Sequence, residues 1–305
     1  GPDIYGYTWV NSFDSGGPSF SWIGDNGAEP SGISGDDVRG SVVLPFTIEH
    51  YGVEYDTITV VTNGWIGMGP DNNYSSSYYD NNSIPNSNPP NNIIVPLWDD
   101  WNVGSSASIL TKTVGTAPSR QFAVIFDKLL HFGDTGTDSY TFEVIFDEAS
   151  RNIIFQYLDV IGSSASYNYG ASSTVGIENA DGTDGLLVSY NSENSILDSM
   201  AITFIPPGSP ALNIYYSSVN FSPVPTIGDT SLEAAYSIGN NYGTGALVID
   251  SIATSYSDYS VNLTEMATGD TIAPGGEVYC DFSWIPNTYG LTLADIVIHH
   301  SGNTS

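Results

Sequence analysis

The chain has 305 residues, which is enough for two domains that each bury a core, and 40% of its residues are hydrophobic. Its 34 acidic residues against 5 lysines and arginines give a formal net charge of −29, which excludes a general nucleic-acid binder because phosphate recognition needs a basic surface. An acidic surface without a long apolar segment is typical of an extracellular or cell-surface protein that does not insert into a membrane.

Short β-strands are predicted along most of the chain. Residues 57–62 and 65–68 are rich in β-branched and aromatic side chains, and the Asn-Gly pair between them predicts a tight hairpin. In the run 140–146, apolar side chains recur at every second position and would share one face of a strand. Further apolar or alternating runs lie at 121–126, 153–157, 173–178, 185–190 and 200–205. No amphipathic helix of convincing length interrupts them, so the sequence predicts an all-β protein.

Two segments differ from this pattern. Residues 71–92 are rich in Asn, Ser, Tyr and Pro, which predicts a long surface loop, and long loops in compact domains are often functional. Residues 206–210 have the sequence PPGSP, and proline blocks regular strand pairing, so we expect a short stiff linker there. We therefore predict two β-sandwich domains in tandem, residues 1–207 and residues 208–305.

The first predicted domain contains short motifs that follow one another over its whole length. They are YGYTW at 5–9, GGP at 16–18, LPF at 44–46, YGVEY at 51–55, TNGW at 62–65, IVPLWDD at 94–100 and VGIEN at 175–179. In order and spacing, these motifs resemble a β-sandwich module of secreted and cell-surface bacterial proteins, often appended to proteases or adhesin-like chains. The resemblance implies a β-sandwich fold and a non-catalytic module.

The second predicted domain resembles the hydin-type, choice-of-anchor-like Ig-like domains of bacterial surface proteins. The motifs that carry this resemblance are IGN at 238–240, GTG at 243–245, LVI at 247–249, IAPGG at 272–276, FSWIP at 282–286 and the run 293–300. In that family one more strand follows. Here the sequence continues only to Ser305, so we expect an Ig-like sandwich that lacks its last strand and exposes an apolar groove with unpaired backbone groups.

The sequence contains no arrangement typical of a catalytic site. It has no HExxH pair, no G-x-S-x-G turn and no phosphate-binding glycine loop. His299 and His300 are neighbours in a predicted strand, so their side chains would point to opposite faces and could not readily bind one metal ion together. The single cysteine, Cys280, lies in an apolar run and is predicted to be a buried thiol. We therefore expect no enzymatic activity.

Clustered carboxylates suggest Ca²⁺ as a cofactor, because this ion prefers oxygen ligands. Asp99 and Asp100 beside a predicted strand end are the first candidates for metal ligands, and Glu178 with Asp181 is the second pair. No regular calcium-loop spacing is present, however. The alternative is that these acids cap turns by accepting hydrogen bonds from backbone amides.

Covalent glycans are also expected on a lysine-poor extracellular surface. The acceptor triplet Asn-x-Ser/Thr occurs at Asn73, Asn81, Asn220, Asn262 and Asn303. A chain this rich in Asn, Ser and Thr contains about five such triplets by chance, so their number carries no weight. The position of the first two in the predicted surface loop is more informative.

These observations predict a structural subunit of an extracellular, glycosylated filament whose partners are copies of itself. Each second domain would receive a strand from the next copy, and head-to-tail contacts of this kind propagate without closing. The expected donor is the apolar N-terminal stretch with Ile4, Tyr5, Tyr7 and Trp9, and the expected acceptor is the strand with Ile296 and Ile298. The first residue is a glycine and not methionine, which is what export followed by cleavage would leave.

Two alternatives stay open. The chain could be a carbohydrate-binding accessory module of a secreted enzyme or adhesin, in which Tyr74, Tyr78, Tyr79 and Trp101 stack on sugar rings. A trimmed multidomain precursor would show the same ending as a strand-deficient subunit.

Overall fold

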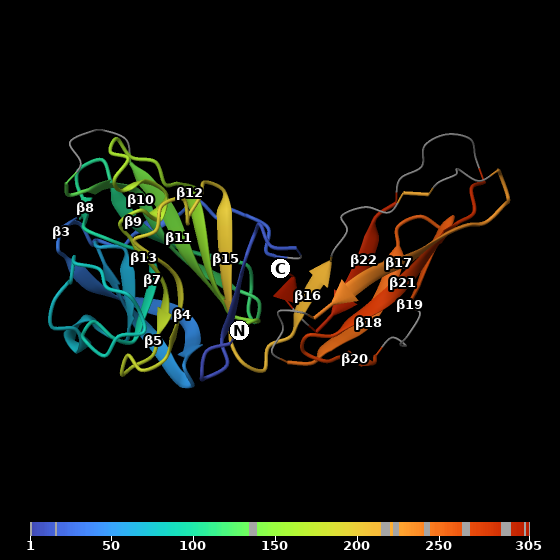
Figure 1. The fold of residues 1–305 in the computed structure, drawn as a ribbon, viewed down its shortest axis with the longest axis horizontal. Helices are drawn as coiled ribbons and strands as arrows, with labels where there is room; N and C mark the ends of the chain where they lie inside the picture. Colours follow the sequence, from blue (N-terminus) through green and yellow to red (C-terminus); the bar gives the residue numbers. More distant parts are fainter. Residues whose placement is uncertain are drawn as a thin grey trace. The chain divides into compact units, whose positions relative to one another are not determined.

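The computed structural model describes residues 2–15, 17–133, 139–214, 220–221, 226–240, 245–263, 269–287, 294–301 and 303–304. The chain divides into two compact units, each an all-β structure (Figure 1). The first consists of Gly1–Phe13 and Pro18–Phe204, and the second of Asp14–Gly17 and Ile205–Ser305. The main division therefore falls beside the proline-rich stretch 206–210.

One sheet of the first unit has nine strands. They are β1 (Thr8–Asn11), β2 (Glu29–Pro30), β3 (Gly35–Asp36), β8 (Trp101–Val103), β9 (Ser108–Val114), β10 (Gln121–His131), β11 (Tyr140–Asp147), β12 (Ile153–Asp159) and β15 (Met200–Ile205). Their order is β1-β15-β12-β11-β10-β8-β3, and β9 pairs with both β10 and β2.

The second sheet of this unit has six strands. They are β4 (Arg39–His50), β5 (Val53–Val61), β6 (Trp65–Met68), β7 (Ile93–Trp98), β13 (Thr174–Glu178) and β14 (Gly185–Tyr190), in the order β14-β13-β7-β6-β5-β4. The predicted hairpin is confirmed, because β5 and β6 pair with Val61 opposite Trp65. Gly64 in its turn has φ +72°, and a Cβ there would lie 2.2 Å from the carbonyl oxygen of Leu97, so only glycine fits.

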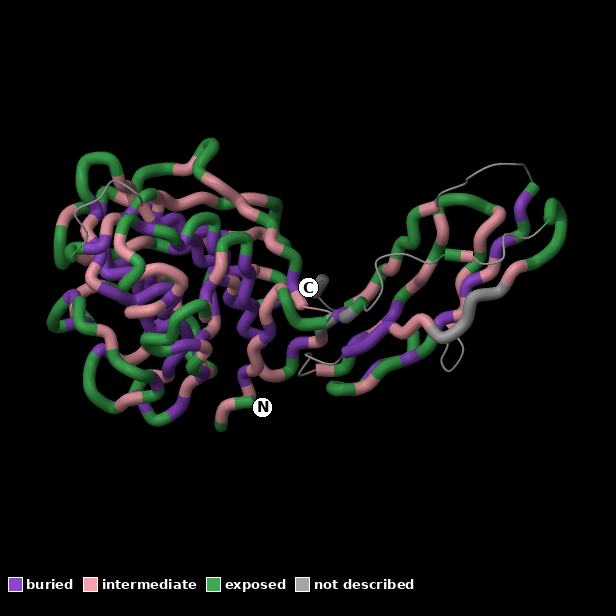
Figure 2. The backbone as a smooth tube through the Cα atoms, turned by 45° about the horizontal axis from the view of Figure 1, so that its top comes forward, coloured by how far each residue is buried: buried purple, intermediate pink, exposed green. Residues whose placement is uncertain are grey.

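The main core lies between these two sheets. In β11, Phe142, Val144 and Phe146 are buried in this core, as their alternation predicts, whereas Ile145 belongs to a separate cluster on the other face. From the opposite sheet, Leu44 and Phe46 reach the same core. Each fully buried aromatic or aliphatic side chain of this kind contributes roughly 1.5–3 kcal/mol. The buried stretches, purple in Figure 2, accordingly follow the strands of this unit.

Buried hydrogen bonds cross from one sheet of the first unit to the other, among them one from the indole nitrogen of Trp101 in β8 to the carbonyl oxygen of Leu97 in β7 at 2.6 Å. The Tyr157 hydroxyl of β12 donates to the carbonyl oxygen of Pro96 in β7 at 2.7 Å. At the end of β10, His131 Nε2 lies 3.0 Å from Oδ1 of Asp99, the residue after β7. The two sheets are therefore joined by specific polar contacts as well as by apolar packing.

The segment 71–92 is a long loop between β6 and β7, as predicted, but it is packed and not free on the surface. It begins with a single-turn 3₁₀ helix, η1 (Asp71–Asn73). The indole nitrogen of Trp65 donates to the carbonyl oxygen of Ser77 at 3.0 Å, and that of Trp98 donates to the carbonyl oxygen of Tyr78 at 2.9 Å. These bonds hold the loop against the outer face of the six-stranded sheet.

The N-terminal stretch lies within its own unit, which corrects its assignment as a strand donated to a neighbour. β1 is paired with β15 at the edge of the nine-stranded sheet. Tyr7 is fully buried in the main core, and Trp9 packs against that core. Asp184 accepts the backbone N–H groups of Ile4 and Tyr5 at 3.0 and 2.8 Å. Donating this stretch would open the unit's own core.

The second unit has a five-stranded and a three-stranded sheet. Their strands are β16 (Ala211–Ile214), β17 (Ser231–Gly239), β18 (Leu247–Thr254), β19 (Tyr259–Leu263), β20 (Thr271–Ile272), β21 (Glu277–Trp284), β22 (Ile296–His300) and β23 (Asn303–Thr304). The orders are β19-β21-β17-β16-β23 and β20-β18-β22. Buried side chains from both sheets form one core, which includes Cys280. The predicted buried thiol is thus confirmed, and burial raises its pKa to about 11.

A short strand follows β22, contrary to the expectation that none would. β23 pairs in parallel with β16, with Ala211 opposite Asn303. β22 itself pairs with β18, with Ile252 opposite Ile298. Its other edge has no strand partner among the residues that the structure describes. A two-residue strand is too short to give a sequence pattern, which is why β23 was not predicted.

Candidate functional site

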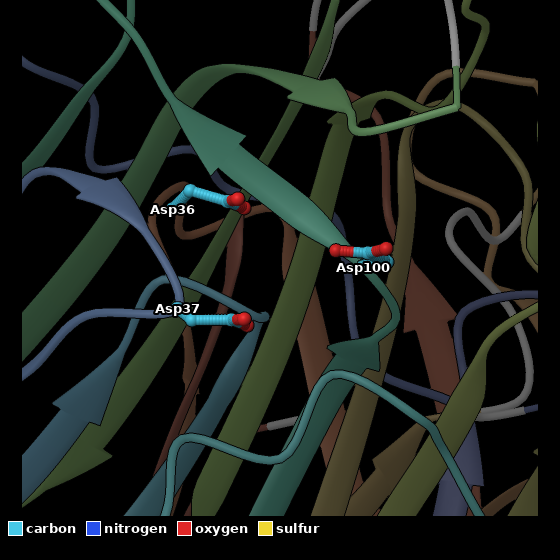
Figure 3. A group of neighbouring side chains, drawn as sticks. All are labelled: Asp36, Asp37 and Asp100. Atoms are coloured by element: carbon cyan, nitrogen blue, oxygen red, sulfur yellow. The ribbon is translucent and has the colours of Figure 1, made fainter.

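Three carboxylates meet where β3 and β8 pair. Asp36 ends β3 and lies opposite Asn102 of β8, Asp37 follows it directly, and Asp100 directly precedes β8. One carboxylate oxygen from each aspartate lies within 4.8 Å of the others. Figure 3 shows the side chains of Asp36 and Asp37 pointing toward Asp100. Within the described ranges, this is the one group of three or more metal-ligating side chains.

The charges of this acid cluster (Asp36, Asp37 and Asp100) repel one another. Burial raises the pKa of Asp100, and the nearby charges of Asp36, Asp37 and Asp99 add to the increase, while His131 opposes it. The pKa of Asp36 is also raised by burial and by Asp37. A hard divalent cation prefers oxygen ligands and would compensate the excess of negative charge at this point. The cluster therefore fits a cation better than an anionic or apolar ligand.

Asp100 was predicted as a metal ligand and lies in this cluster, whereas Asp36 and Asp37 were missed. The signal for them was the pair of adjacent aspartates after Gly35. Their proximity to Asp100 depends on the pairing of β3 with β8, two strands far apart in the sequence. Local sequence patterns do not reveal such a pairing.

Asp99 has a different role from its neighbour, and its assignment as a metal ligand is corrected. Its carboxylate is buried and accepts hydrogen bonds from Ser172 Oγ at 2.5 Å and Ser173 Oγ at 3.1 Å, in addition to the contact with His131. The backbone N–H of Gly133 donates to His131 Nδ1 at 3.0 Å, so Nε2 carries the hydrogen that faces Asp99. The carboxylate has no free position for a metal ion.

This arrangement is not that of a nucleophile with its base. Both serines bond to Asp99 and neither to His131 in the described contacts, so the imidazole is not placed to accept a serine proton. The aspartate instead joins three chain segments at one buried point.

Glu178 and Asp181 do not form a shared pair. Glu178 at the end of β13 is fully buried, and its Oε2 accepts the backbone N–H of Asn86 at 2.7 Å. Burial raises its pKa to about 7. Asp181 is exposed and accepts hydrogen bonds from the hydroxyl and the backbone N–H of Thr183, which lower its pKa. Asp181 therefore caps a turn, as the alternative interpretation held.

The predicted glycosylation sites differ in access. Asn73 is exposed in η1, and Asn220 is also exposed. The Asn81 amide nitrogen donates to the carbonyl oxygen of Ser172 at 2.7 Å, to Thr174 Oγ1 at 3.1 Å and to Asn191 Oδ1 at 2.9 Å. A glycan on that nitrogen would disrupt these bonds, so the assignment of Asn81 is corrected. The side chains of Asn262 and Asn303 lie outside the described residues.

The aromatic residues proposed to stack on sugars are largely unavailable. Trp101 is fully buried, and Tyr74 is buried with its hydroxyl donating to the carbonyl oxygens of Met68 and Asn92. Tyr78 is half-buried and Tyr79 is 46% exposed. A single exposed ring does not make a stacking platform, so the structure gives no support to this alternative.

The predicted acceptor strand β22 presents apolar side chains to solvent. Ile296 is 39% and Val297 43% exposed. Ile298 is half-buried and packs against the core of the second unit. The strand thus combines an apolar surface with an edge to which no other described strand pairs.

Comparison with known families gave one match. A family model described as NIDO related matches residues 12–217, more than half of the chain. The search of curated proteins and the search of solved structures each found no match. In the part of the chain that the structure describes, no helix is both long and apolar enough to cross a membrane.

Proposed function

The chain belongs to the NIDO-related family, whose domains are typical of extracellular proteins, and we propose that it is a structural, non-catalytic subunit of an extracellular fibre. The observation that carries this proposal is the edge of β22 that has no strand partner among the residues that the structure describes. An edge strand offers a row of backbone N–H and C=O groups to which another strand can add. Exposed Ile296 and Val297 on this strand would gain from being covered.

We propose that a strand from a second copy of the chain pairs with this edge of β22. Copies joined in this way use two different surfaces, so contacts repeat from one copy to the next and build a linear polymer. The N-terminal stretch is not the donor, because it completes its own sheet. The donor is then another segment, and its identity does not affect the test of the acceptor edge.

The test compares two substitutions of exposed valines. Val297→Lys places a charge on the edge strand, the device by which natural proteins prevent strand addition. Val53→Lys is the matched control, since Val53 is 50% exposed on β5 of the first unit. Negative-stain microscopy and sedimentation should show fibres for the unchanged chain and for Val53→Lys, and single particles for Val297→Lys. Fibres that persist in Val297→Lys, or an unchanged chain that stays monomeric at high concentration, would overturn the proposal.

Two expected additions belong to the same proposal. Ca²⁺ in the acid cluster would offset the repulsion among its three carboxylates and part of the repulsion between copies that carry a charge of −29 each. Covalent glycans would lie at the exposed Asn73 and Asn220. Both additions suit a fibre that works outside the cell.

A further inference from the structure

A strap of chain, residues 18–28, lies along the outer face of the nine-stranded sheet. Its Trp22 and Ile23 pack against the separate apolar cluster on that face. The side chain of Gln156 in β12 binds the backbone of Ser21 at two points: its Oε1 accepts the N–H at 2.5 Å, and its Nε2 donates to the carbonyl oxygen at 2.7 Å. The sheet therefore holds the strap through its backbone as well as by apolar packing.

The end of the strap is fixed on both sides of a turn. Before the turn, Lys112 Nζ donates to the carbonyl oxygens of Ile23 and Gly24 at 3.1 and 3.3 Å. After the turn, β2 pairs with β9, with Glu29 opposite Thr111. The turn therefore has to span a set distance, and a change in the length of its backbone would strain one of these contacts.

The turn itself is exposed and lightly held. The backbone N–H of Ala28 donates to the carbonyl oxygen of Asp25 at 2.8 Å, which closes the turn. Gly27 has φ +78°, and a Cβ added there would meet no atom within 4 Å. Asn26 is exposed, and in the described part of the chain neither its side chain nor the Gly27 N–H forms a hydrogen bond. Both groups are therefore free to approach each other.

An exposed Asn-Gly pair with this freedom can modify itself. The backbone nitrogen of Gly27 attacks Cγ of Asn26, and the new C–N bond closes a succinimide ring. The bond from Cγ to the side-chain nitrogen breaks, and that NH₂ group leaves as ammonia with the proton from the Gly27 nitrogen. Water then opens the ring at either carbonyl carbon and leaves aspartate or isoaspartate. Glycine favours ring closure, because it has no Cβ to obstruct the approach and its backbone rotates readily.

The other Asn-Gly pair of the sequence, Asn63-Gly64, is protected by the fold. Asn63 is fully buried, and its side-chain amide is hydrogen-bonded to Asp37 and to the N–H of Trp101. The N–H of Gly64 donates to the carbonyl oxygen of Val61 at 3.1 Å. Both reacting groups are occupied, so ring closure there requires local opening of the hairpin.

We propose that Asn26 is a self-modification site that loosens this end of the strap as the chain ages. Isoaspartate carries the backbone through its side-chain carbon atoms, which adds a methylene group to the turn between its two fixed points. Either product also places a carboxylate directly after Asp25, and the two charges repel each other. The hydrogen bond that closes the turn at Ala28 is the contact most directly strained by both changes.

The two Asn-Gly pairs test the proposal within one chain. The full chain is kept in warm, mildly alkaline buffer, and peptide mass spectrometry follows deamidation at Asn26 and Asn63 over time. Asn26 should react about tenfold faster than Asn63 or more, because only Asn63 depends on local opening. In denaturant, where neither pair is held by the fold, the two rates should agree within about threefold. Equal rates in the folded chain, or an intact Asn26 there while the denatured chain reacts, would overturn the site.

A variant and a second measurement complete the test. Gly27→Ala should slow deamidation of Asn26 by about tenfold or more, because a Cβ obstructs the attacking nitrogen and restricts the backbone rotation that brings it to Cγ. An unchanged rate in this variant would contradict the mechanism. Hydrogen exchange of residues 25–29 should be faster in the modified chain than in fresh chain, with β11 as the unaffected reference. Unchanged exchange in a fully modified chain would overturn the effect on the strap. None of these outcomes bears on fibre formation, which the β22 variants test.

Discussion

The amide nitrogen of Asn63 donates a 2.7 Å hydrogen bond to the carboxylate of Asp37, joining the turn of the β5–β6 hairpin to the acid cluster. The oxygen of the same amide accepts the backbone N–H of Trp101 at 3.0 Å. Asn63 is fully buried, and its bond to Trp101 forms away from water, whereas Asp37 is exposed. The residue that identifies the hairpin in the sequence thus also positions the candidate site.

Asn63→Ala should lower the free energy of unfolding by about 2–4 kcal/mol, because it removes the buried hydrogen bond to the Trp101 N–H and opens a small cavity. Denaturant titration would measure this change. Asn82→Ala is the control, since Asn82 is exposed and its substitution should cost less than about 0.5 kcal/mol. A similar decrease in the free energy of unfolding in both variants would mean that the buried hydrogen bonds of Asn63 do not stabilise the fold.

Asp100→Asn should raise the melting temperature of the calcium-free chain at pH 7. The pKa of Asp100 lies above its ordinary value, so this group favours the folded state only at low pH, and its charge disfavours folding once it has ionised. The same substitution should also remove any rise of the melting temperature on adding Ca²⁺. Scanning calorimetry with and without a chelator measures both effects. An unchanged response to Ca²⁺ would show that the acid cluster is not a binding site.

Glu143 should make the stability of the first unit depend on pH. Its Oε1 accepts the N–H of Ile23 at 2.9 Å, its Oε2 is buried without a hydrogen-bond partner, and burial raises its pKa to about 7. This pKa lies above the value of 4.5 that Glu143 has in the unfolded chain. The stabilisation by Glu143 is therefore fully present below pH 4.5 and is lost as the pH rises through 7.

Glu143→Gln should accordingly be more stable than the unchanged chain at pH 8, by about 1–3 kcal/mol, and show no such gain at pH 4.5. Unfolding titrations across this range test the difference, and Glu54→Gln on the exposed end of β5 serves as the control. A difference that does not vary with pH would assign the effect of Glu143 to packing alone.

Glycans should be found on Asn73 and not on Asn81 when the protein is isolated from its native source. The Asn81 amide is occupied by three hydrogen bonds, whereas Asn73 is exposed. Peptide mass spectrometry would locate the modified residues. Asn81→Gln should also lower the melting temperature more than Asn73→Gln does. A glycan on Asn81 of the folded chain would contradict the structure.

The sequence was sufficient for features that depend on local patterns. The hairpin at 57–68 follows from an Asn-Gly pair between two β-rich runs, and the alternation in 140–146 places Phe142 and Val144 in the core as observed. These features need only the period of a strand and the chemistry of a tight turn.

Features that depend on distant contacts were not predictable in this way. Asp99 and Asp100 are adjacent and chemically identical, yet one is buried against His131 and the other faces Asp36 across two paired strands. Which of the two aspartates is buried depends on the backbone at the end of β7 and on the position of His131 in β10.

The polar contacts that cross the first unit give this domain a particular response to mechanical load. For one sheet to slide past the other, the hydrogen bonds that cross between them, such as Tyr157–Pro96 and Asp99–His131, must break. Both are buried, so water cannot replace them until the sheets have already separated. A domain built this way should resist sliding of its two sheets more strongly than one joined by apolar packing alone.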